Sequence, residues 1–340
     1  MKKLISRTVS LLIVAAIALA GYEAYFKKPA PNSPNEAITF GAETDTAEIA
    51  KALKESGVIS SAALFKTISG LSGSFKDFHA GTFIFKEGMS VVDALKTLSY
   101  NGPKEIGVTI PEGWGLREIG ERLVAMGVVK TKEELIAVTG EPGKTAKLSE
   151  NIVREYAFLS SKPADANLEG YLFPDTYRFY PNSSAADVVG KLLGTFGEKT
   201  KEHWTPDQLH GRSVHEVLTM ASILEAEVKD EVDRAKIADI LFRRLEVGMP
   251  LQVDSSVNYI TGKNTPSISG NDKSIDSKWN TYKYKGLPPG PIGNPGLASI
   301  RATLSPTPNR FWYFLTAPDG TVIYSKTLDE HNAAKTKYLK

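Results

Sequence analysis

The sequence predicts an α+β protein in which helices dominate the C-terminal half. Three observations carry this prediction. A strand, helix, helix, strand pattern occurs twice before Lys201, an amphipathic helical pattern begins at Ser213, and two strands flank a Pro-Asp-Gly turn near the C-terminus. With 340 residues, 41% of them hydrophobic and 24% charged, the chain is long enough for two or three domains.

Charge and cysteine content exclude several classes of protein. The formal net charge is only +2 at pH 7, so bulk electrostatics do not favour nucleic acid as a partner. The chain contains no cysteine, which excludes disulfides, thiolate nucleophiles and cysteine-ligated zinc sites.

The N-terminal residues 1–27 have the pattern of an export signal. Three basic residues precede an apolar stretch that covers about residues 8–26, and this order directs the rest of the chain out of the cytoplasm. Cleavage after Ala20 is one outcome. We expect the other, a retained membrane anchor, because the stretch reaches the roughly 17 residues that a membrane span needs. Residues 28–36 then form an extended tether.

Residues 37–102 and 103–200 contain two diverged copies of one unit. A shift of 70 positions aligns Glu48 with Glu118, Ile49 with Ile119, Leu53 with Leu123, Gly57 with Gly127 and Val58 with Val128. A second shift, of 94 positions, aligns Phe85 with Phe179, Ser90 with Ser184 and Asp93 with Asp187. The second copy therefore carries an insertion of about 24 residues, around 141–165.

Each copy is expected to form a strand, two helices, a second strand and a further helix. Such units resemble LysM modules, which bind glycans that contain N-acetylglucosamine; a duplicated structural spacer is the alternative. The aromatic segment GYLFPDTYRFY at 170–180 favours sugar binding, because flat rings make good platforms for sugars, although such rings are equally common in a core.

A helix that begins at Ser213 carries the most informative residue, Glu225. Ser213 and Glu216 have the spacing of a capping box. At 100° per residue Glu225 shares one stripe with apolar residues, whereas Glu227 falls on the opposite side and is expected to face water. That stripe consists of Val214, Leu218, Ala221 and Val228.

Two interpretations of Glu225 remain open on periodicity alone. A carboxyl group against apolar side chains keeps its proton to higher pH, so it can act as a general acid near neutral pH. A glycosidase acid is made in this way. The structural alternative is a buried ion pair, for which Arg234, Arg243 and Arg244 stand close enough along the chain.

The remaining C-terminal half is expected to frame the site. A second helix covers about 231–247 and stops at Gly248. The polar residues that follow could line a cleft, with Asp254 as the only nearby second carboxylate; they are Gln252, Asp254, Ser255 and Ser256. The segment 279–296 is rich in proline and glycine and predicts a stiff loop, and the hairpin after it is interpreted as scaffold.

Four segments together resemble the YceG-like family of endolytic murein transglycosylases. They are EGYLFPDTYRF at 169–179, MASILEAE at 220–227, LQVDSSVNY at 251–259 and NTYKYKGLPPGPIGNPG at 280–296. The resemblance implies a single-pass inner-membrane protein that faces the periplasm, with a LysM-like region and a catalytic domain at 201–340 similar to goose-type lysozyme. Many relatives carry Asp-Pro-[ST] where this chain has Ser255-Ser256, which leaves the shape of that loop open.

The resemblance also implies roles for individual residues. Glu225 matches the catalytic glutamate of the family, and six other residues are expected near the substrate groove: Gln252, Asp254, Ser255, Asn280, Tyr282 and Asn294. The implied reaction is lytic transglycosylation, in which the C6 hydroxyl of N-acetylmuramic acid attacks its own C1 and leaves a 1,6-anhydro end. An intramolecular nucleophile has a large effective concentration, which makes a second carboxylate dispensable.

Glu225 is therefore expected to act first as acid and then as base, with no metal and no organic cofactor. The expected partners are peptidoglycan glycan strands and, from the family alone, peptidoglycan synthases of the elongation machinery. Two alternatives stay open. One is a hydrolytic muramidase that uses Asp254 to hold water, and the other is a non-catalytic scaffold that binds peptidoglycan.

Overall fold

The computed structural model describes residues 21–28, 30, 35–41, 44–72, 81–99, 105–144, 155–263, 265 and 268–339. The chain divides into two compact units, Met1–Ile106 with Arg178–Ser183, and Gly107–Tyr177 with Ser184–Lys340. Most of the expected anchor at 1–27 lies outside the described residues. Among the described residues, no helix combines the length and the apolar character that crossing a membrane requires.

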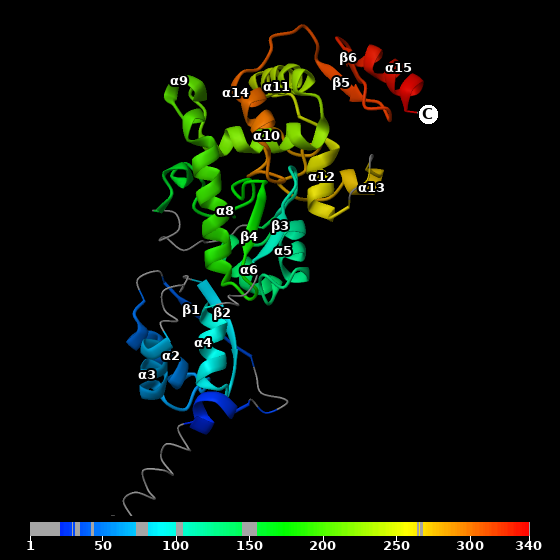
Figure 1. Cartoon of the computed structure of the whole chain (residues 1–340). Helices are drawn as coiled ribbons and strands as arrows, with labels where there is room; N and C mark the ends of the chain where they lie inside the picture. The colour runs from blue at the N-terminus through cyan, green and yellow to red at the C-terminus, as the bar shows by residue number, and fades with distance from the viewer. Residues whose placement is uncertain are drawn as a thin grey trace, which may run out of the picture. The chain divides into compact units, whose positions relative to one another are not determined.

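The first unit has the element order that the duplication predicts. β1 (Asn35–Phe40) pairs antiparallel with β2 (Gly81–Lys86), from Asn35 opposite Lys86 to Phe40 opposite Gly81. The helices are α2 (Thr46–Glu55), α3 (Ala62–Ser72) and α4 (Val91–Ser99), preceded by the short π-helix η1 (Tyr22–Phe26) (Figure 1). Asp45 caps α2 by accepting a hydrogen bond from the backbone N–H of Glu48. The apolar side chains of α2, α3, α4 and both strands form one core.

The second copy repeats the same order of elements. It consists of β3 (Ile106–Thr109), α5 (Leu116–Ala125), α6 (Lys132–Thr139), β4 (Thr176–Phe179) and α8 (Ala185–Thr200), with η3 (Ala157–Leu159) in the insertion. β3 pairs with β4. The aligned residues Ile49, Leu53 and Val58, like Ile119, Leu123 and Val128, are fully buried. Gly57 and Gly127 both have a left-handed φ, 72° and 71°. Both segments therefore contain the predicted order of elements, and the assignment of the two units as LysM-like copies stays a prediction.

All aromatic residues of the segment 170–180 except the half-buried Tyr180 lie in the core. Tyr171, Phe173 and Tyr177 are buried. The rings of Tyr171 and Phe173 pack against Phe196 of α8, with centroids 5.8 and 6.5 Å apart. The interpretation of these three rings as sugar platforms is therefore wrong, because α8 covers them.

Three helices form the centre of the C-terminal half. α14 (Leu297–Leu304) packs against both α10 (Val214–Glu227) and α11 (Glu231–Glu246). The capping box of Ser213 and Glu216 at the start of α10 is confirmed, and α11 ends just before Gly248, whose φ is 67°. Shorter elements surround this centre: η4 (Lys201–His203), α9 (Pro206–Leu209), α12 (Asp254–Thr261) and α13 (Gly270–Lys273).

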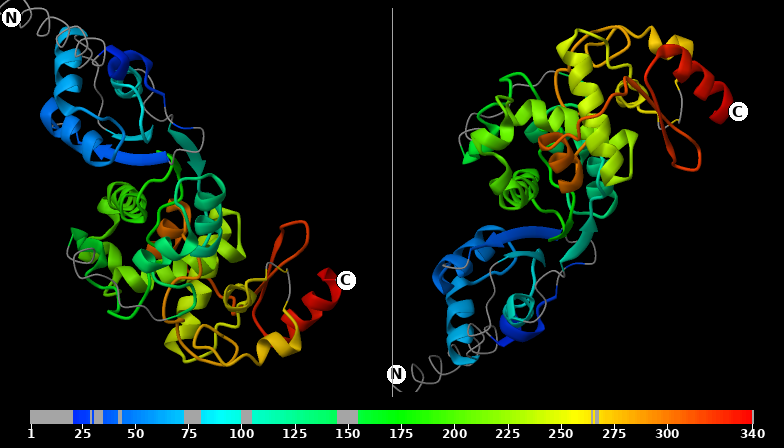
Figure 2. Two further views of the ribbon diagram at one scale, coloured as in Figure 1. Left: turned by 90° about the horizontal axis from the view of Figure 1, so that it is seen from below. Right: turned by 90° about the horizontal axis from the view of Figure 1, so that it is seen from above.

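The C-terminal hairpin is also confirmed. β5 (Tyr313–Thr316) pairs antiparallel with β6 (Val322–Ser325), and α15 (Leu328–Tyr338) lies beside them in both views of Figure 2. Two arginines of α11 tie this region to the helices, because Arg243 donates to the carbonyl oxygen of Phe311 and Arg244 to that of Trp312. Both guanidinium groups thus bind the hairpin region and do not pair with Glu225.

Candidate active site

Glu225 lies in the last turn of α10, where its side chain retains only 7% of its exposure. Three donors reach its carboxyl group. Arg234 Nη2 donates to Oε1 at 2.7 Å, while the backbone N–H of Gly296 and the hydroxyl of Ser299 donate to Oε2 at 3.0 and 2.9 Å. Hydrogen bonds of this kind stabilise the carboxylate, and burial opposes them. The sequence suggested burial and an arginine partner for Glu225, but not the two donors from Gly296 and Ser299.

The side chain of Arg234 is buried and makes a second hydrogen bond besides the one to Glu225. This side chain is 8% exposed, and Nε of Arg234 donates to the carbonyl oxygen of Val228 at 2.7 Å. Val228 caps the end of α10, and Arg234 lies in the first turn of α11, so the connection between the two helices sets the position of the guanidinium. The buried ion pair that formed the structural alternative for Glu225 is therefore present, with Arg234 as the partner.

The N-terminus of α14 supplies the other two donors. Gly296 is the N-cap of α14, and Ser299 is its third residue. The first N–H groups of a helix have no partner within the helix, and the helix dipole is positive at this end, so a carboxylate is stabilised there. Residues 290–296 reach this position as an irregular but buried segment, which confirms the predicted absence of helix and strand.

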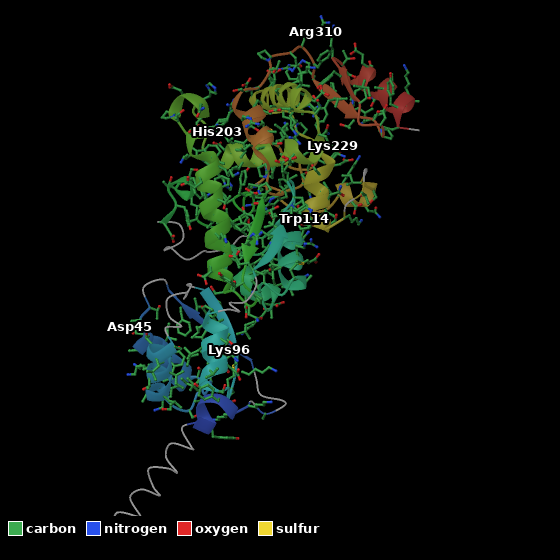
Figure 3. The ribbon with its side chains drawn as sticks, viewed as in Figure 1. Asp45, Lys96, Trp114, His203, Lys229 and Arg310 are labelled. Atoms are coloured by element: carbon green, nitrogen blue, oxygen red, sulfur yellow. The ribbon has the colours of Figure 1, made fainter. Side chains whose placement is uncertain are left out.

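A turn after β3 completes the surroundings of Glu225. The N–H of Gly113 donates to the carbonyl oxygen of Asn294 at 2.8 Å, and the N–H of Asn294 donates to that of Trp114 at 2.9 Å. Trp114 is labelled in Figure 3. Only glycine fits at Gly293, because a Cβ there would lie 2.5 Å from the carbonyl oxygen of Gly113. Gly113 has a φ of 81°, which favours glycine, and a Cβ there would lie at ordinary contact distance, 3.4 Å, from Cγ of Glu225.

This turn also brings a second carboxyl group, that of Glu112, to the site. A Cβ on Gly296 would lie 1.9 Å from Oε1 of Glu112, so the Glu112 carboxyl group packs directly against the backbone of Gly296. Partial burial raises the pKa of Glu112, and the negative charge of Glu225 raises it further; the positive charges of Arg234 and Arg301 act in the opposite direction. Glu112 is exposed, unlike Glu225.

A third carboxyl group, that of Glu169, is buried next to the turn that follows β3. It accepts hydrogen bonds from the N–H of Leu116 at 2.9 Å, the hydroxyl of Tyr259 at 3.1 Å and Nδ2 of Asn294 at 3.3 Å. Burial raises the pKa of Glu169 to about 8, against these hydrogen bonds. At 1% exposure Glu169 cannot meet a substrate, and its contacts join α5, α12 and the buried loop.

Three of the residues expected near the groove, Asp254, Ser255 and Tyr282, lie close to Glu227 at the end of α10. Asp254 and Glu227 form a second cluster of carboxyl groups there. The hydroxyl of Tyr282 donates to Oδ1 of Asp254, and the N–H of Ser255 donates to Oε1 of Glu227 at 3.4 Å. Burial raises the pKa of Glu227, and the charge of Asp254 adds to the rise. The prediction that Glu227 faces water is wrong, because the start of α12 covers it.

The other three expected groove residues differ in exposure. Gln252 is exposed and has a φ of 55°, a left-handed conformation that is unusual for a residue with a side chain. Asn280 and Asn294 are fully buried. Nδ2 of Asn280 donates to the carbonyl oxygens of Lys273 and Ile275, and Oδ1 of Asn294 accepts from the N–H of Leu172. In this structure both asparagines hold backbone segments and do not line a groove.

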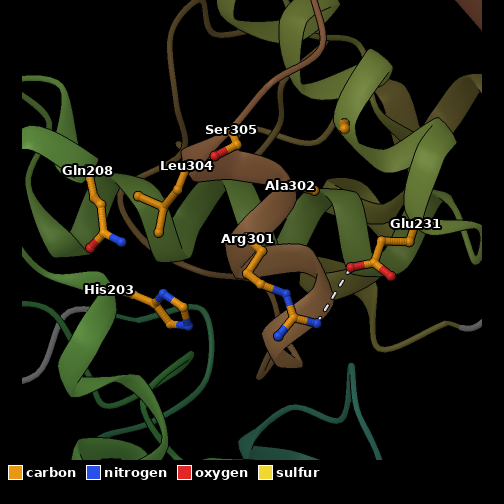
Figure 4. A pocket seen from close by; sticks show the side chains of 8 residues that line it. His203, Gln208, Glu231, Arg301, Ala302, Leu304 and Ser305 are labelled. Atoms are coloured by element: carbon orange, nitrogen blue, oxygen red, sulfur yellow. Dashed lines mark hydrogen bonds and ion pairs between the residues drawn. The ribbon is translucent and has the colours of Figure 1, made fainter.

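A cavity of about 380 Å³ lies beside α14 (Figure 4). It is lined by His203, Gln208, Glu231, Ala235, Arg301, Ala302, Leu304 and Ser305. Figure 4 shows the Arg301 guanidinium directed toward Glu231, 3.5 Å away. Glu225 is not among the lining residues. Arg301 lines this cavity, and its positive charge lowers the pKa of Glu112.

The sequence singled out Glu225 but not the neighbours that the structure places around it, Glu112, Gly296 and Ser299. The segment PEGWG that contains Glu112 follows a strand and is rich in turn-forming residues, which is the one local signal that marked it. Among the residues that the structure describes, no three His, Asp or Glu side chains are grouped as metal ligands would be.

Comparison with known proteins gives consistent matches along the chain. A model described as the YceG-like family matches residues 38–337. The endolytic murein transglycosylase of Bacillus subtilis (strain 168) is 34% identical over 307 residues, which cover 89% of this chain and 84% of that protein. The protein of the same name from Streptococcus pneumoniae (strain D39) is 28% identical over 350 residues; the match covers 96% of this chain but only 63% of the relative.

A solved structure matches the fold as well. The crystal structure of a YceG-like protein from Listeria monocytogenes is 30% identical to this chain and aligns with a TM-score of 0.60. The alignment covers 89% of this chain and 100% of that one.

Proposed function

Because this chain belongs to the YceG-like family, we propose that it is an endolytic murein transglycosylase. It would cleave nascent peptidoglycan strands between N-acetylmuramic acid and N-acetylglucosamine and leave 1,6-anhydro-N-acetylmuramic acid ends. The identity of 34% with a protein of that name, over most of both chains, supports the assignment. Termination of strand elongation is the role that such a cut would serve.

The observation that carries the proposal is the environment of Glu225. In lytic transglycosylation the C6 hydroxyl loses its proton as it attacks C1, and the leaving oxygen gains one. A carboxylate that three donors hold in one orientation suits the removal of the C6 proton, because its geometry is fixed before the substrate binds. If Glu225 also serves as the acid, it must hold a proton when the substrate arrives.

The exposed and half-buried residues at the end of α10 are the proposed substrate contacts. Gln252, Asp254, Ser255 and Tyr282 offer amide, carboxylate and hydroxyl groups, which hydrogen-bond well to sugar hydroxyls and acetamido groups. Asn280 and Asn294, which are fully buried, would support the groove from within. The substitution Gln252→Ala should therefore raise KM for glycan strands, whereas an unchanged KM would remove Gln252 from the groove.

Location and glycan binding outside the catalytic region belong to the same proposal. We expect the N-terminal segment to anchor the chain in the inner membrane, with the catalytic region in the periplasm and synthases of the elongation machinery nearby. Mass spectrometry of the mature N-terminus tests the anchor, since a chain that starts after Ala20 has lost it.

Glycan binding by the LysM-like region has a separate test. N-acetylglucosamine oligomers should slow hydrogen exchange in residues 35–99 of the full chain, and unchanged exchange would contradict glycan binding there.

The proposed activity is tested by comparing the wild-type protein with the variant Glu225→Gln on purified peptidoglycan strands. Wild type should release fragments with anhydro ends, and the variant should lose at least about a hundredfold in rate. Fragments one water heavier would indicate a muramidase. Absence of fragments from wild type would favour the non-catalytic scaffold, and a variant as active as wild type would remove Glu225 from the reaction.

A further inference from the structure

Glu112 and Glu225 meet at a single residue, Gly296. The N–H of Gly296 donates to Oε2 of Glu225 at 3.0 Å, and its Cα faces the carboxyl group of Glu112, where a methyl group would collide at 1.9 Å. A Cβ on Gly113, the residue that follows Glu112 in the chain, would be in ordinary van der Waals contact with Cγ of Glu225, at 3.4 Å. The two carboxyl groups therefore belong to one site, although one comes from the turn after β3 and the other from α10.

The two carboxyl groups differ in their hydrogen-bond partners. Glu225 accepts three hydrogen bonds, one of them a charge-assisted bond from a buried guanidinium. Glu112 makes no hydrogen bond and no ion pair with any residue that the structure describes. The charged groups that act on it are Glu225 from α10, Arg234 from α11 and Arg301 from α14, and burial together with Glu225 raises its pKa. The raised pKa of Glu112, together with its lack of hydrogen-bond donors among these residues, favours its protonated form.

The two groups also differ in access. Glu112 is exposed, whereas the Glu225 side chain is 7% exposed and both of its oxygens are engaged. A proton donor has to reach the glycosidic oxygen of a bound strand, and the exposed carboxyl group can do so without breaking existing contacts. When neighbouring carboxyl groups have environments that favour different protonation states, acid and base roles follow from that difference.

We propose that Glu112 is a second catalytic carboxyl group, which protonates the leaving glycosidic oxygen while the Glu225 carboxylate accepts the proton of the C6 hydroxyl. This inference rests on the proposed transglycosylase function. The bond from C1 to the leaving oxygen breaks and the bond from C1 to O6 forms. One proton moves from Glu112 to the leaving oxygen and one from O6 to Glu225. Return of a proton from Glu225 to Glu112 restores the site, with no water consumed.

A substrate with an activated leaving group tests the division of roles. A nitrophenyl glycoside of the disaccharide that ends in N-acetylmuramic acid keeps the attacking C6 hydroxyl, but its phenolate leaves without a proton. Glu112→Gln should lose about 10²- to 10⁴-fold on natural strands, the usual contribution of a general acid, and less than about tenfold on the aryl glycoside. Glu225→Gln should lose activity on both substrates.

Controls keep the outcomes distinct. Glu121→Gln, an exposed glutamate on α5 that pairs with Lys132, should behave as wild type on both substrates. Thermal unfolding of each variant shows that it is folded. Equal losses of Glu112→Gln on the two substrates, or no loss on either, would overturn the acid role. If wild type itself releases no anhydro product from natural strands, the proposed function fails instead, whatever the Glu112 variant does.

Discussion

Arg234 and Glu225 form an ion pair 2.7 Å long in which both side chains are more than nine-tenths buried. Two charges that are withdrawn from water depend on each other, because removal of one leaves the other buried without compensation. This pair joins the last turn of α10 to the first turn of α11, and it orients the carboxylate that we propose to be catalytic.

The first prediction concerns this pair. Arg234→Met should lower the free energy of unfolding by about 3–5 kcal/mol, since Glu225 then remains buried without its cation. The double variant with Glu225→Gln should lose less than the sum of the two single variants, because neither charge is then left alone. Urea unfolding of the four proteins measures this coupling, and additive losses would show that the ion pair has no energetic role. Arg301→Met, which breaks an exposed pair, is the control and should change stability by less than about 1 kcal/mol.

Alanine substitutions at two glycines of the buried segment 290–296 should separate effects on activity from effects on stability. Gly296→Ala introduces a methyl group against the flexible end of the Glu112 side chain, so Glu112 has to move away. We expect about tenfold or greater loss of activity on glycan strands, with less than about 1 kcal/mol lost in stability.

Gly293→Ala is the matched variant, because its methyl group would meet the carbonyl oxygen of Gly113, which is backbone and cannot move aside. We expect a loss of about 1–3 kcal/mol in the free energy of unfolding. Thermal unfolding and strand cleavage of both variants provide the measurement. A Gly296→Ala protein with wild-type activity would show that the position of Glu112 is unimportant.

The buried Glu169 predicts a dependence of stability on pH. Its pKa is raised from 4.5 to about 8 in the folded protein, so the folded state binds a proton that the unfolded state has released between these values. Its stabilising contribution is full below about pH 4.5 and is lost as pH rises toward about 8, where it should have fallen by more than about 1 kcal/mol. Urea unfolding across this range should show a weaker pH dependence for Glu169→Gln. Parallel curves for the two proteins would mean that Glu169 does not titrate there.

Alanine substitution at the corresponding glycines of the two copies should lower the free energy of unfolding by similar amounts. Gly57 and Gly127 end equivalent helices at φ values of 72° and 71°, where a side chain is strained, so alanine at either position should lower the free energy of unfolding by about 1–2 kcal/mol. Gly194, inside α8 with open space around it, is the control. Alanine at this position should raise the free energy of unfolding by about 0.5–1 kcal/mol. A stabilising Gly127→Ala substitution would contradict the structural equivalence of the two copies.

Local patterns predicted the elements of this fold well. The capping box at Ser213, the helix stop at Gly248 and both strand, helix, helix, strand, helix units follow from periodicity and turn residues, and all are confirmed. The rings of Tyr171 and Phe173 could not be assigned in this way, because an aromatic side chain suits both a core and a sugar platform until a covering helix such as α8 is known.

The surroundings of Glu225 were only partly predictable. Helical periodicity indicated its burial and sequence proximity suggested Arg234, but the other two donors come from Gly296 and Ser299, which are far away in the chain. Glu112 stands in a turn without periodicity, so only its packing against Gly296 reveals it. Glu227 was misjudged for a related reason: helical geometry describes the faces of α10, but not the start of α12 that covers one of them.

The most direct test of the central claim follows the oxygen atom that ends up on the cut sugar. Purified strands are cleaved by the wild-type protein in heavy-oxygen water, and the new ends are analysed by mass spectrometry. If the C6 hydroxyl attacks C1, with Glu225 as the base, the new ends are 1,6-anhydro sugars that contain no label. New reducing ends that carry one heavy oxygen atom would contradict the account, because water would then be the nucleophile.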